Sequence, residues 1–231
     1  MYDVFFISYD EPNADENWDR LKQKMPVAQR VHGVKGILNA HKQCAEKCST
    51  KMFYVVDGDS EVMESFDFKY IPPDHQQSFI HVWRARNPVN GLIYGYGGIK
   101  LLPVRHVLDM PAMATDMTTS LSNAFVVMPN LASITHFNSS PFNAWRAAFR
   151  ECTKLSSQSI ERQNTDETVR RLEIWKTMGA HKVFGKYVIE GAEQGQQFGQ
   201  ANAEDRDQLS RINDFDWLKE RFKGIYGDNS I

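Results

Sequence analysis

The feature that most constrains the fold is a short apolar run at residues 52–56, which stops at Asp57, Gly58 and Asp59. Its aromatic and β-branched residues predict a buried β-strand. In open α/β sheets ligands bind beyond the carboxyl ends of the strands, where these two acids are expected to lie. Paired carboxylates at that edge suit Mg²⁺ or Mn²⁺ carrying a diphosphate. The competing interpretation is a polar turn, because Asp and Gly are common in turns.

The N-terminal residues repeat this pattern. A strand-like run at residues 2–9 breaks at the turn-forming residues 10–13, which include two further acids. Residues 17–25 are compatible with a helix, and apolar residues recur every three or four positions from 31 to 48, as in an amphipathic helix. This strand, helix, strand order predicts two parallel strands whose acidic ends share one edge of the sheet, with a nucleotide bound between them.

A pair of arginines follows a later strand-like segment. Residues 78–84 alternate as a strand does, and Arg84 and Arg86 lie at and just beyond its end. Guanidinium groups bind phosphate in a bidentate fashion, so both are candidates for holding a diphosphate. An exposed loop without a ligand is the equally weighted alternative.

A well-marked helix begins after Ser140, which is expected to cap it, with Pro141 in its first turn. Arg146, Arg150 and Lys154 recur on one face at a spacing of four. Such a basic face is by default solvated, and contact with a phosphate backbone is the minority interpretation.

Length and composition are those of an ordinary globular protein. The chain has 231 residues, of which 42% are hydrophobic, and a net charge of −2. We expect one α/β domain with a mixed, mostly parallel central sheet flanked by helices. Residues 1–160 are predicted to form the nucleotide- and acceptor-binding core, and residues 161–231 a helical extension packed on it. The charge balance gives no general support to nucleic-acid binding, which would have to rest on a local patch.

The three cysteines fit a reducing compartment. Cys44 and Cys48 lie one helical turn apart and Cys152 is distant, so a disulfide framework is not expected. His41 with Cys44 and Cys48 is an alternative metal site, but the spacing fits the buried face of a helix better. A cytoplasmic location is expected, because neither a signal peptide nor a run long enough to span a bilayer is visible.

The residues resemble a known family. The order of strand, acid, glycine and acid after a βαβ unit resembles nucleotide-sugar glycosyltransferases of the GT-A fold. More closely, the chain resembles a family of small proteins of T4-like bacteriophages that are described as glycosyltransferases. The resemblance runs nearly end to end and is carried by FFISYDEPNADENW, RVHGVKGI, KMFYVVDGDSEV, HVWRARNP, YGYGGIKLLP, DMTTS, FNSSPFNAWRAAFRECTKLSS and INDFDWLKERF.

The resemblance implies a GT-A-like domain and a metal-dependent transfer of a hexose or pentose from a nucleoside-diphosphate sugar, most simply a UDP sugar. In such enzymes the acids hold Mn²⁺ or Mg²⁺, which neutralises the leaving diphosphate. Carried over to this chain, Asp59 and Asp57 are metal ligands, and Asp57 also faces the donor. The other residues assigned to donor binding are Asp10, Glu11, Asn13, Lys35, Arg84 and Arg86.

Two further roles follow from the resemblance. His136 is the candidate for a histidine metal ligand, with a capping or core histidine as the alternative. An inverting transfer needs a carboxylate that takes the proton of the acceptor hydroxyl, and Asp116 is the candidate. The paired acids of inverting relatives are not evident there, so the base and the stereochemical outcome stay open.

The acceptor is also implied by the resemblance. Phages of this kind glycosylate 5-hydroxymethylcytosine in their DNA, so the expected acceptor is that base, or a sugar already attached to it, in double-stranded DNA. The expected location is then the host cytoplasm during infection. Two alternatives stay open: a nucleotidyltransferase of the same fold class, and a non-catalytic phage interaction protein on a transferase fold.

Overall fold

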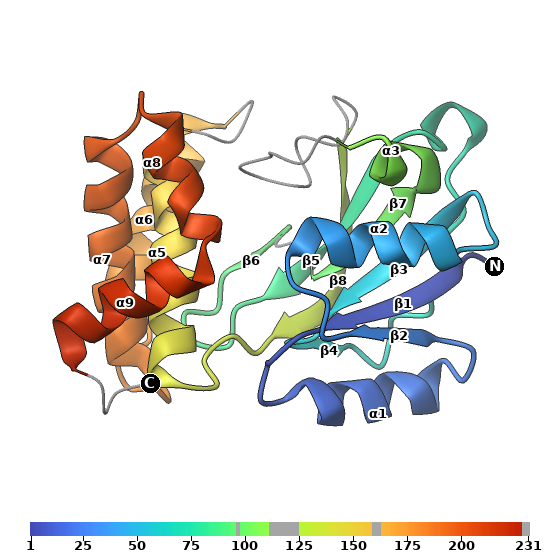
Figure 1. Ribbon diagram of the computed structural model, residues 1–231, viewed down its shortest axis with the longest axis horizontal. Coiled ribbons are helices and arrows are strands. Elements are labelled where there is room, and N and C mark those ends of the chain that lie inside the picture. Colours follow the sequence, from blue (N-terminus) through green and yellow to red (C-terminus); the bar gives the residue numbers. More distant parts are fainter. Residues whose placement is uncertain (96–97, 111–124, 159–162, 228–231) are drawn as a thin grey trace. The chain divides into compact units, whose positions relative to one another are not determined.

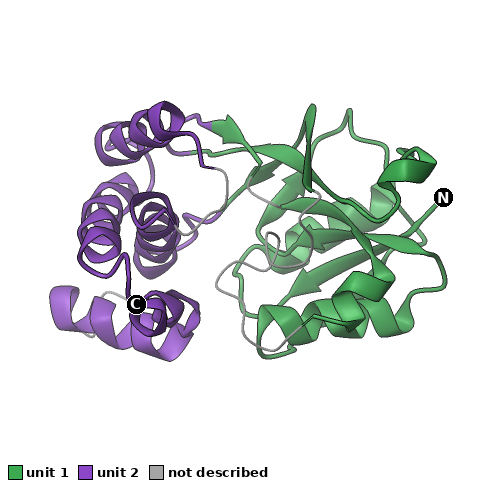
Figure 2. Cartoon of the chain, turned by 90° about the horizontal axis from the view of Figure 1, so that it is seen from above, with its two compact units in different colours: residues 1–88, 93–136 green, residues 89–92, 137–231 purple. Residues whose placement is uncertain are grey.

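The computed structural model describes residues 1–95, 98–110, 125–158 and 163–227 (Figure 1). The chain divides into two compact units, coloured separately in Figure 2: residues 1–88 with 93–136, and residues 89–92 with 137–231. The predicted core ended at residue 160, whereas the first unit ends at residue 136. The packing of residues 161–231 on that core stays a prediction. Among the described helices, none is long and apolar enough to cross a bilayer.

The first unit is built on an eight-stranded mixed sheet. The strand order is β2-β1-β3-β7-β5-β8-β4, and β6 pairs with β5 beside this path. The pairs β1–β2, β1–β3 and β5–β8 are parallel, whereas β3–β7, β5–β7, β5–β6 and β4–β8 are antiparallel. The strands are β1 Asp3–Ser8, β2 Gln29–His32, β3 Met52–Asp57, β4 Ser60–Val62, β5 Ile80–Arg86, β6 Ile93–Tyr94, β7 Ile99–Pro103 and β8 Phe125–Thr135.

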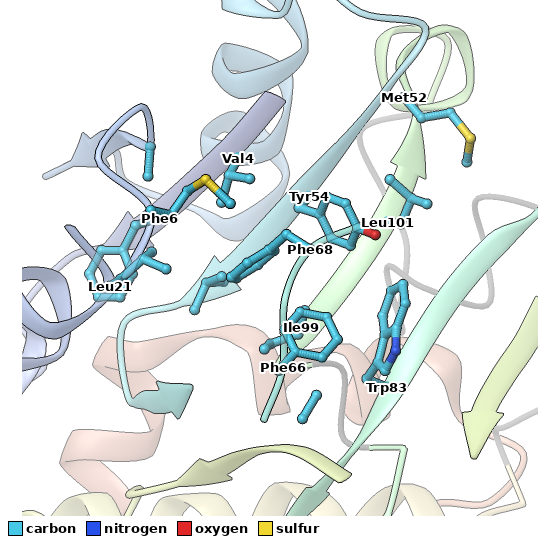
Figure 3. Close-up of a cluster of buried hydrophobic side chains, with 14 of the residues drawn as sticks. Val4, Phe6, Leu21, Met52, Tyr54, Phe66, Phe68, Trp83, Ile99 and Leu101 are labelled. Atoms are coloured by element: carbon cyan, nitrogen blue, oxygen red, sulfur yellow. The ribbon is translucent and has the colours of Figure 1, made fainter. Parts of the chain in front are cut away.

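Helices cover both faces of this sheet. Helix α1 (Ala14–Lys24) packs through Leu21 into an apolar cluster on one face, shown in Figure 3, where Tyr54, Phe66 and Trp83 lie side by side. Helices α2 (Ile37–Lys47) and α3 (Val104–Leu108) pack into the cluster on the other face, and the short helix η1 (Asp74–Gln76) precedes β5. The predicted α/β class and mixed central sheet flanked by helices are confirmed.

One predicted helix is wrong at its start. Residues 31–48 were predicted to be helical throughout, but Val31 lies in the edge strand β2 and the helix begins at Ile37. Gly33 and Gly36 have φ angles of 74° and 91°, in the left-handed region where glycine is favoured, and they separate the strand from the helix. The apolar residues that recur every three to four positions therefore extend over two elements, β2 and α2.

The second unit is helical, which confirms the predicted helical C-terminal region. As predicted, Ser140 caps α5, and its Oγ accepts a hydrogen bond from the Asn143 backbone N–H at 3.1 Å. Helix α7 approaches α5 so closely that a Cβ on Gly195 would lie 2.3 Å from the Phe149 carbonyl oxygen. The elements are α5 Pro141–Ser156, α6 Thr165–Thr177, α7 Gly185–Ala201, α8 Arg206–Ser210, η2 Arg211–Asn213 and α9 Phe215–Tyr226.

Candidate functional site

The carboxyl ends of β1 and β3 meet, as the sequence predicted. The two strands are parallel, and Ile7 is the register partner of Asp57. The buried Asn17 of α1 donates a hydrogen bond from Nδ2 to the Gly58 carbonyl oxygen at 2.9 Å, which fixes the turn between the two acids. A Cβ on Gly58 would lie 2.8 Å from Glu11 Oε2, so the acidic segment after β1 lies directly against this turn.

Asp57 forms an ion pair that the sequence did not reveal. Lys100 of β7 donates from Nζ to Asp57 Oδ1 at 2.8 Å and to Oδ2 at 2.9 Å. The Lys100 side chain is 6% exposed and the Asp57 side chain 30%. Burial raises the pKa of the Asp57 carboxyl above its ordinary value, and the Lys100 ammonium opposes that rise. Both carboxylate oxygens of Asp57 therefore have a cationic partner within the protein.

His136 lies next to Asp59, but its ring is bonded elsewhere. The His136 backbone N–H donates to the Asp59 carbonyl oxygen at 2.7 Å. Its Nε2 is 2.7 Å from Glu61 Oε2, and the other oxygen of Glu61 is 2.8 Å from a guanidinium nitrogen of Arg20. The carboxylate of Glu61 is thus shared between Arg20 and His136.

These contacts do not fit the predicted metal site of Asp57, Asp59 and His136. Asp57 binds Lys100 with both oxygens, and the ring of His136 binds Glu61. Within the part of the chain that the structure describes, no group of three His, Cys, Asp or Glu side chains is arranged to hold a metal ion. The metal and the three ligands stay a prediction from the resemblance.

A polar cluster joins the ends of β1 and β2. Ser8 and His32 are register partners, and Ser8 Oγ is 3.0 Å from His32 Nδ1. Arg30 donates from Nε to Ser8 Oγ at 2.9 Å and forms an ion pair of 2.7 Å with Asp15. Sequence reasoning missed this cluster because it interpreted the segment around Val31 as helix.

The predicted donor-binding residues that follow β1 and β2 differ in their exposure and in their hydrogen bonds. Asp10 is exposed, and Glu11 accepts a hydrogen bond from the Tyr9 backbone N–H at 2.8 Å. Asn13 precedes α1, and its Oδ1 is buried without a hydrogen-bond partner among the described residues. Lys35 is exposed in the loop between β2 and α2.

Arg84 and Arg86 are exposed at the end of β5. Lys100 pairs in register with Val55 on one side and Val82 on the other, so β3 and β5 run in the same direction. Because side chains alternate along a strand, Arg84 and Arg86 project from the same face of the sheet as Val82.

Three hydroxyl groups surround Gly98, just before β7. A Cβ there would lie 2.5 Å from Ser60 Oγ, 3.2 Å from Ser133 Oγ and 3.3 Å from Thr135 Oγ1. None of these three oxygens has a hydrogen-bond partner among the described residues. Since the Asp57 backbone N–H donates to the Gly98 carbonyl oxygen at 2.9 Å, this hydroxyl cluster adjoins the acidic turn. No motif in the sequence pointed to it.

The remaining candidates are Asp116 and the basic stripe of α5. Asp116 lies outside the described residues. In the second unit, Arg150 donates to the Ile212 carbonyl oxygen at 2.8 Å, and Arg146 stacks 4.2 Å from the centroid of the Phe215 ring. Lys154 is within 3.6 Å of a carboxylate oxygen of Glu151. The basic stripe of α5 therefore makes contacts within its own unit.

The His41 and Cys44 side chains belong to the core. Both residues belong to α2, and both are fully buried. Burial lowers the pKa of His41 to about 3, with a further contribution from the Lys100 ammonium, and raises the pKa of Cys44 to about 12. The thiol is thus held in its protonated form, as expected of a buried structural cysteine.

Comparisons with known proteins give limited similarity. No protein-family model and no curated protein matches the chain. Among solved structures, the chain is similar to HddC from Yersinia pseudotuberculosis complexed with GMP-PN, at 13% identity and a TM-score of 0.44, covering 57% of this chain and 92% of that one. A second structure of that HddC gives 14% identity and a TM-score of 0.40 over the same shares of the two chains. A glycosyltransferase involved in the glycosylation of the major capsid of PBCV-1 matches at 14% identity and a TM-score of 0.34, covering 55% of this chain and 81% of that one. With TM-scores below 0.5, these similarities carry no argument about function.

Proposed function

We propose that this protein is a glycosyltransferase that moves a sugar from a nucleoside-diphosphate sugar to an acceptor hydroxyl. The observation that carries the proposal is the meeting of two acidic strand ends, held together at Gly58 by Glu11 and Asn17. Carboxyl edges of open α/β sheets are where such folds bind ligands. The resemblance to the T4-like phage family supplies the reaction class.

In this proposal the donor lies across the ends of β1 and β3. Asp10, Glu11 and Asn13 face the nucleoside, and the buried, unpartnered Oδ1 of Asn13 is an acceptor for a base or ribose N–H or O–H group, within the residues described. The diphosphate lies toward Arg84 and Arg86, whose exposed guanidinium groups are matched to phosphate oxygens. A UDP sugar is the first donor to test.

Transfer needs a base for the acceptor hydroxyl, and His136 is a second candidate beside Asp116. In the neutral tautomer that donates its Nε2–H to Glu61, the proton acceptor of the ring is Nδ1. In the proposed step, Nδ1 takes the proton of the acceptor hydroxyl while the oxygen bonds to the anomeric carbon. The bond from that carbon to the diphosphate oxygen breaks, and the nucleoside diphosphate leaves with the electron pair.

The proposed acceptor is 5-hydroxymethylcytosine, or a sugar attached to it, in double-stranded DNA. This part rests on the resemblance to the phage family. Phosphate contacts position a protein on DNA. Arg84 and Arg86 are assigned to the donor diphosphate, and the arginines of α5 bind within their own unit, so we assign no residue to the DNA phosphates.

The test is product analysis. DNA containing hydroxymethylcytosine is incubated with UDP, GDP, ADP and CDP sugars and digested to nucleosides for mass spectrometry, with unmodified DNA as the control. We expect a hexose or pentose mass gain and release of a nucleoside diphosphate, both lost in Asp59→Asn. Release of pyrophosphate from a nucleoside triphosphate would indicate a nucleotidyltransferase instead. No product with any donor would support the non-catalytic phage protein.

A separate comparison assigns the base. If His136 is the base, His136→Gln lowers turnover by about 10²-fold or more, whereas Asp116→Asn leaves turnover unchanged. The reverse result would assign the base to Asp116.

A further inference from the structure

We propose that Lys100 supplies, within the protein, the positive charge that a divalent cation supplies in a two-aspartate site, so that this edge of the sheet binds a nucleoside diphosphate without metal. The nucleotide part of this inference rests on the proposed function. The ion-pair part rests on the geometry of Lys100 and Asp57 alone.

Both carboxylate oxygens of Asp57 are already bound within the protein. The Lys100 ammonium lies 2.8 and 2.9 Å from its two oxygens, so each oxygen of the carboxylate already has a charged donor. A metal ion at Asp57 would have to share these oxygens with the ammonium. At metal–oxygen distances of about 2.1–2.2 Å the ion would lie within about 5 Å of Nζ, where two positive charges repel strongly in a partly buried site.

The Lys100 ammonium is buried, so its charge cannot be moved into water. Its side chain is 6% exposed, and it projects from the middle of the sheet, in register with Val55 and Val82. The neighbouring His41 ring is fully buried and uncharged, with a pKa of about 3 that the Lys100 ammonium helps to lower. An unpaired ammonium in this apolar setting is strongly unfavourable, so releasing Asp57 to a metal is opposed by the fold.

His136, another of the three predicted ligands, is also engaged within the protein. The His136 ring binds Glu61, which is itself bound to Arg20. Meanwhile the neutralised Asp57 no longer repels a diphosphate, and the exposed Arg84 and Arg86 provide donors that phosphate oxygens accept without a bridging cation. Lys100 is therefore a positioning and neutralising residue, and the arginines are the direct phosphate ligands.

The deciding experiment is a titration of the full, metal-free chain with Mn²⁺ alone, in which the signal of free Mn²⁺ is followed by electron paramagnetic resonance. We expect the native chain and Asp57→Asn to bind Mn²⁺ equally weakly. Lys100→Met, which keeps the length of the side chain without the charge, should bind Mn²⁺ about 10-fold or more tightly, a gain abolished in Lys100→Met/Asp57→Asn. The proposal is overturned if the native chain binds Mn²⁺ about 10-fold more tightly than Asp57→Asn does. That comparison needs no Lys100 variant, so it stands even if Lys100→Met does not fold.

A second arm separates this inference from the proposed function. Thermal unfolding of the native chain is measured with UDP, GDP, ADP and CDP, in EDTA and in Mn²⁺. We expect one diphosphate to raise the midpoint equally in both buffers. A rise that EDTA abolishes overturns the metal-free inference and leaves the proposed function intact. No rise in either buffer contradicts the proposed function, while the Mn²⁺ titration still decides the role of Lys100.

Discussion

Removing the carboxylate of Asp57 should destabilise the first unit by an amount that measures its pairing with Lys100. Breaking a fully buried ion pair by removing one partner costs about 3–5 kcal/mol. Because 30% of the Asp57 side chain is exposed, water compensates part of that loss for the 6% exposed Lys100. We therefore expect Asp57→Asn to lower the free energy of unfolding by about 2–3 kcal/mol at pH 7.

The assay is urea unfolding followed by circular dichroism and tryptophan fluorescence, with Lys100→Met and the double variant completing a double-mutant cycle. The matched control is Lys69→Met, which removes a lysine from an ion pair whose two side chains are 78% and 62% exposed. That change should cost less than about 0.5 kcal/mol, as is usual for exposed pairs. A loss in Asp57→Asn no larger than in this control would refute the reasoning, because Asp57 would then be available to a ligand.

The remaining predictions concern the core, the helices and the turn. Burial lowers the pKa of His41 to about 3, so as the pH falls below 6.5 this histidine binds a proton in the unfolded chain but not in the folded one. The free energy of unfolding should therefore drop by about 2 kcal/mol from pH 7 to pH 5. His41→Leu should flatten this dependence of stability on pH, as measured by urea titrations. Gly195→Ala should lower the free energy of unfolding by about 1–3 kcal/mol, because the added Cβ would collide with the backbone of α5. Gly224→Ala should stabilise α9 by up to about 1 kcal/mol, because no atom lies within 4 Å of the added Cβ. Thermal unfolding of both variants tests these two expectations. Asn17→Ala should weaken nucleoside diphosphate binding about 10-fold, by calorimetric titration, because it frees the turn at Gly58; unchanged affinity would contradict that role.

Local patterns were sufficient to predict much of the fold. The bounded apolar runs predicted the parallel strands β1 and β3, and Ser140 followed by Pro141 predicted the start of α5. Short or distorted strands were harder to predict from the sequence. β2 has only four residues, and β8 is long and irregular. Its register shifts opposite β5, so no regular alternation continues through the segment around Pro129.

The candidate site was only partly readable from the sequence. The acids of the turn at Gly58 and their position at a sheet edge followed from strand and turn signals. Lys100 gave no such signal, because a single lysine in an apolar strand is usually an exposed residue, and its partner Asp57 is 43 positions away. Likewise His136 reaches Glu61 across 75 positions, a contact that arises only when β4 pairs with β8. Tertiary pairing of this kind leaves no local pattern.

The most direct test of the central claim is calorimetric titration of the full chain with UDP, GDP, ADP and CDP, compared with Glu11→Ala. If the joined ends of β1 and β3 form a donor site, one nucleoside diphosphate binds the native chain and its affinity falls about 10-fold or more in the variant, because Glu11 is assigned to the nucleoside and lies against the turn at Gly58. Absence of binding by all four, or binding that Glu11→Ala does not change, would contradict the claim.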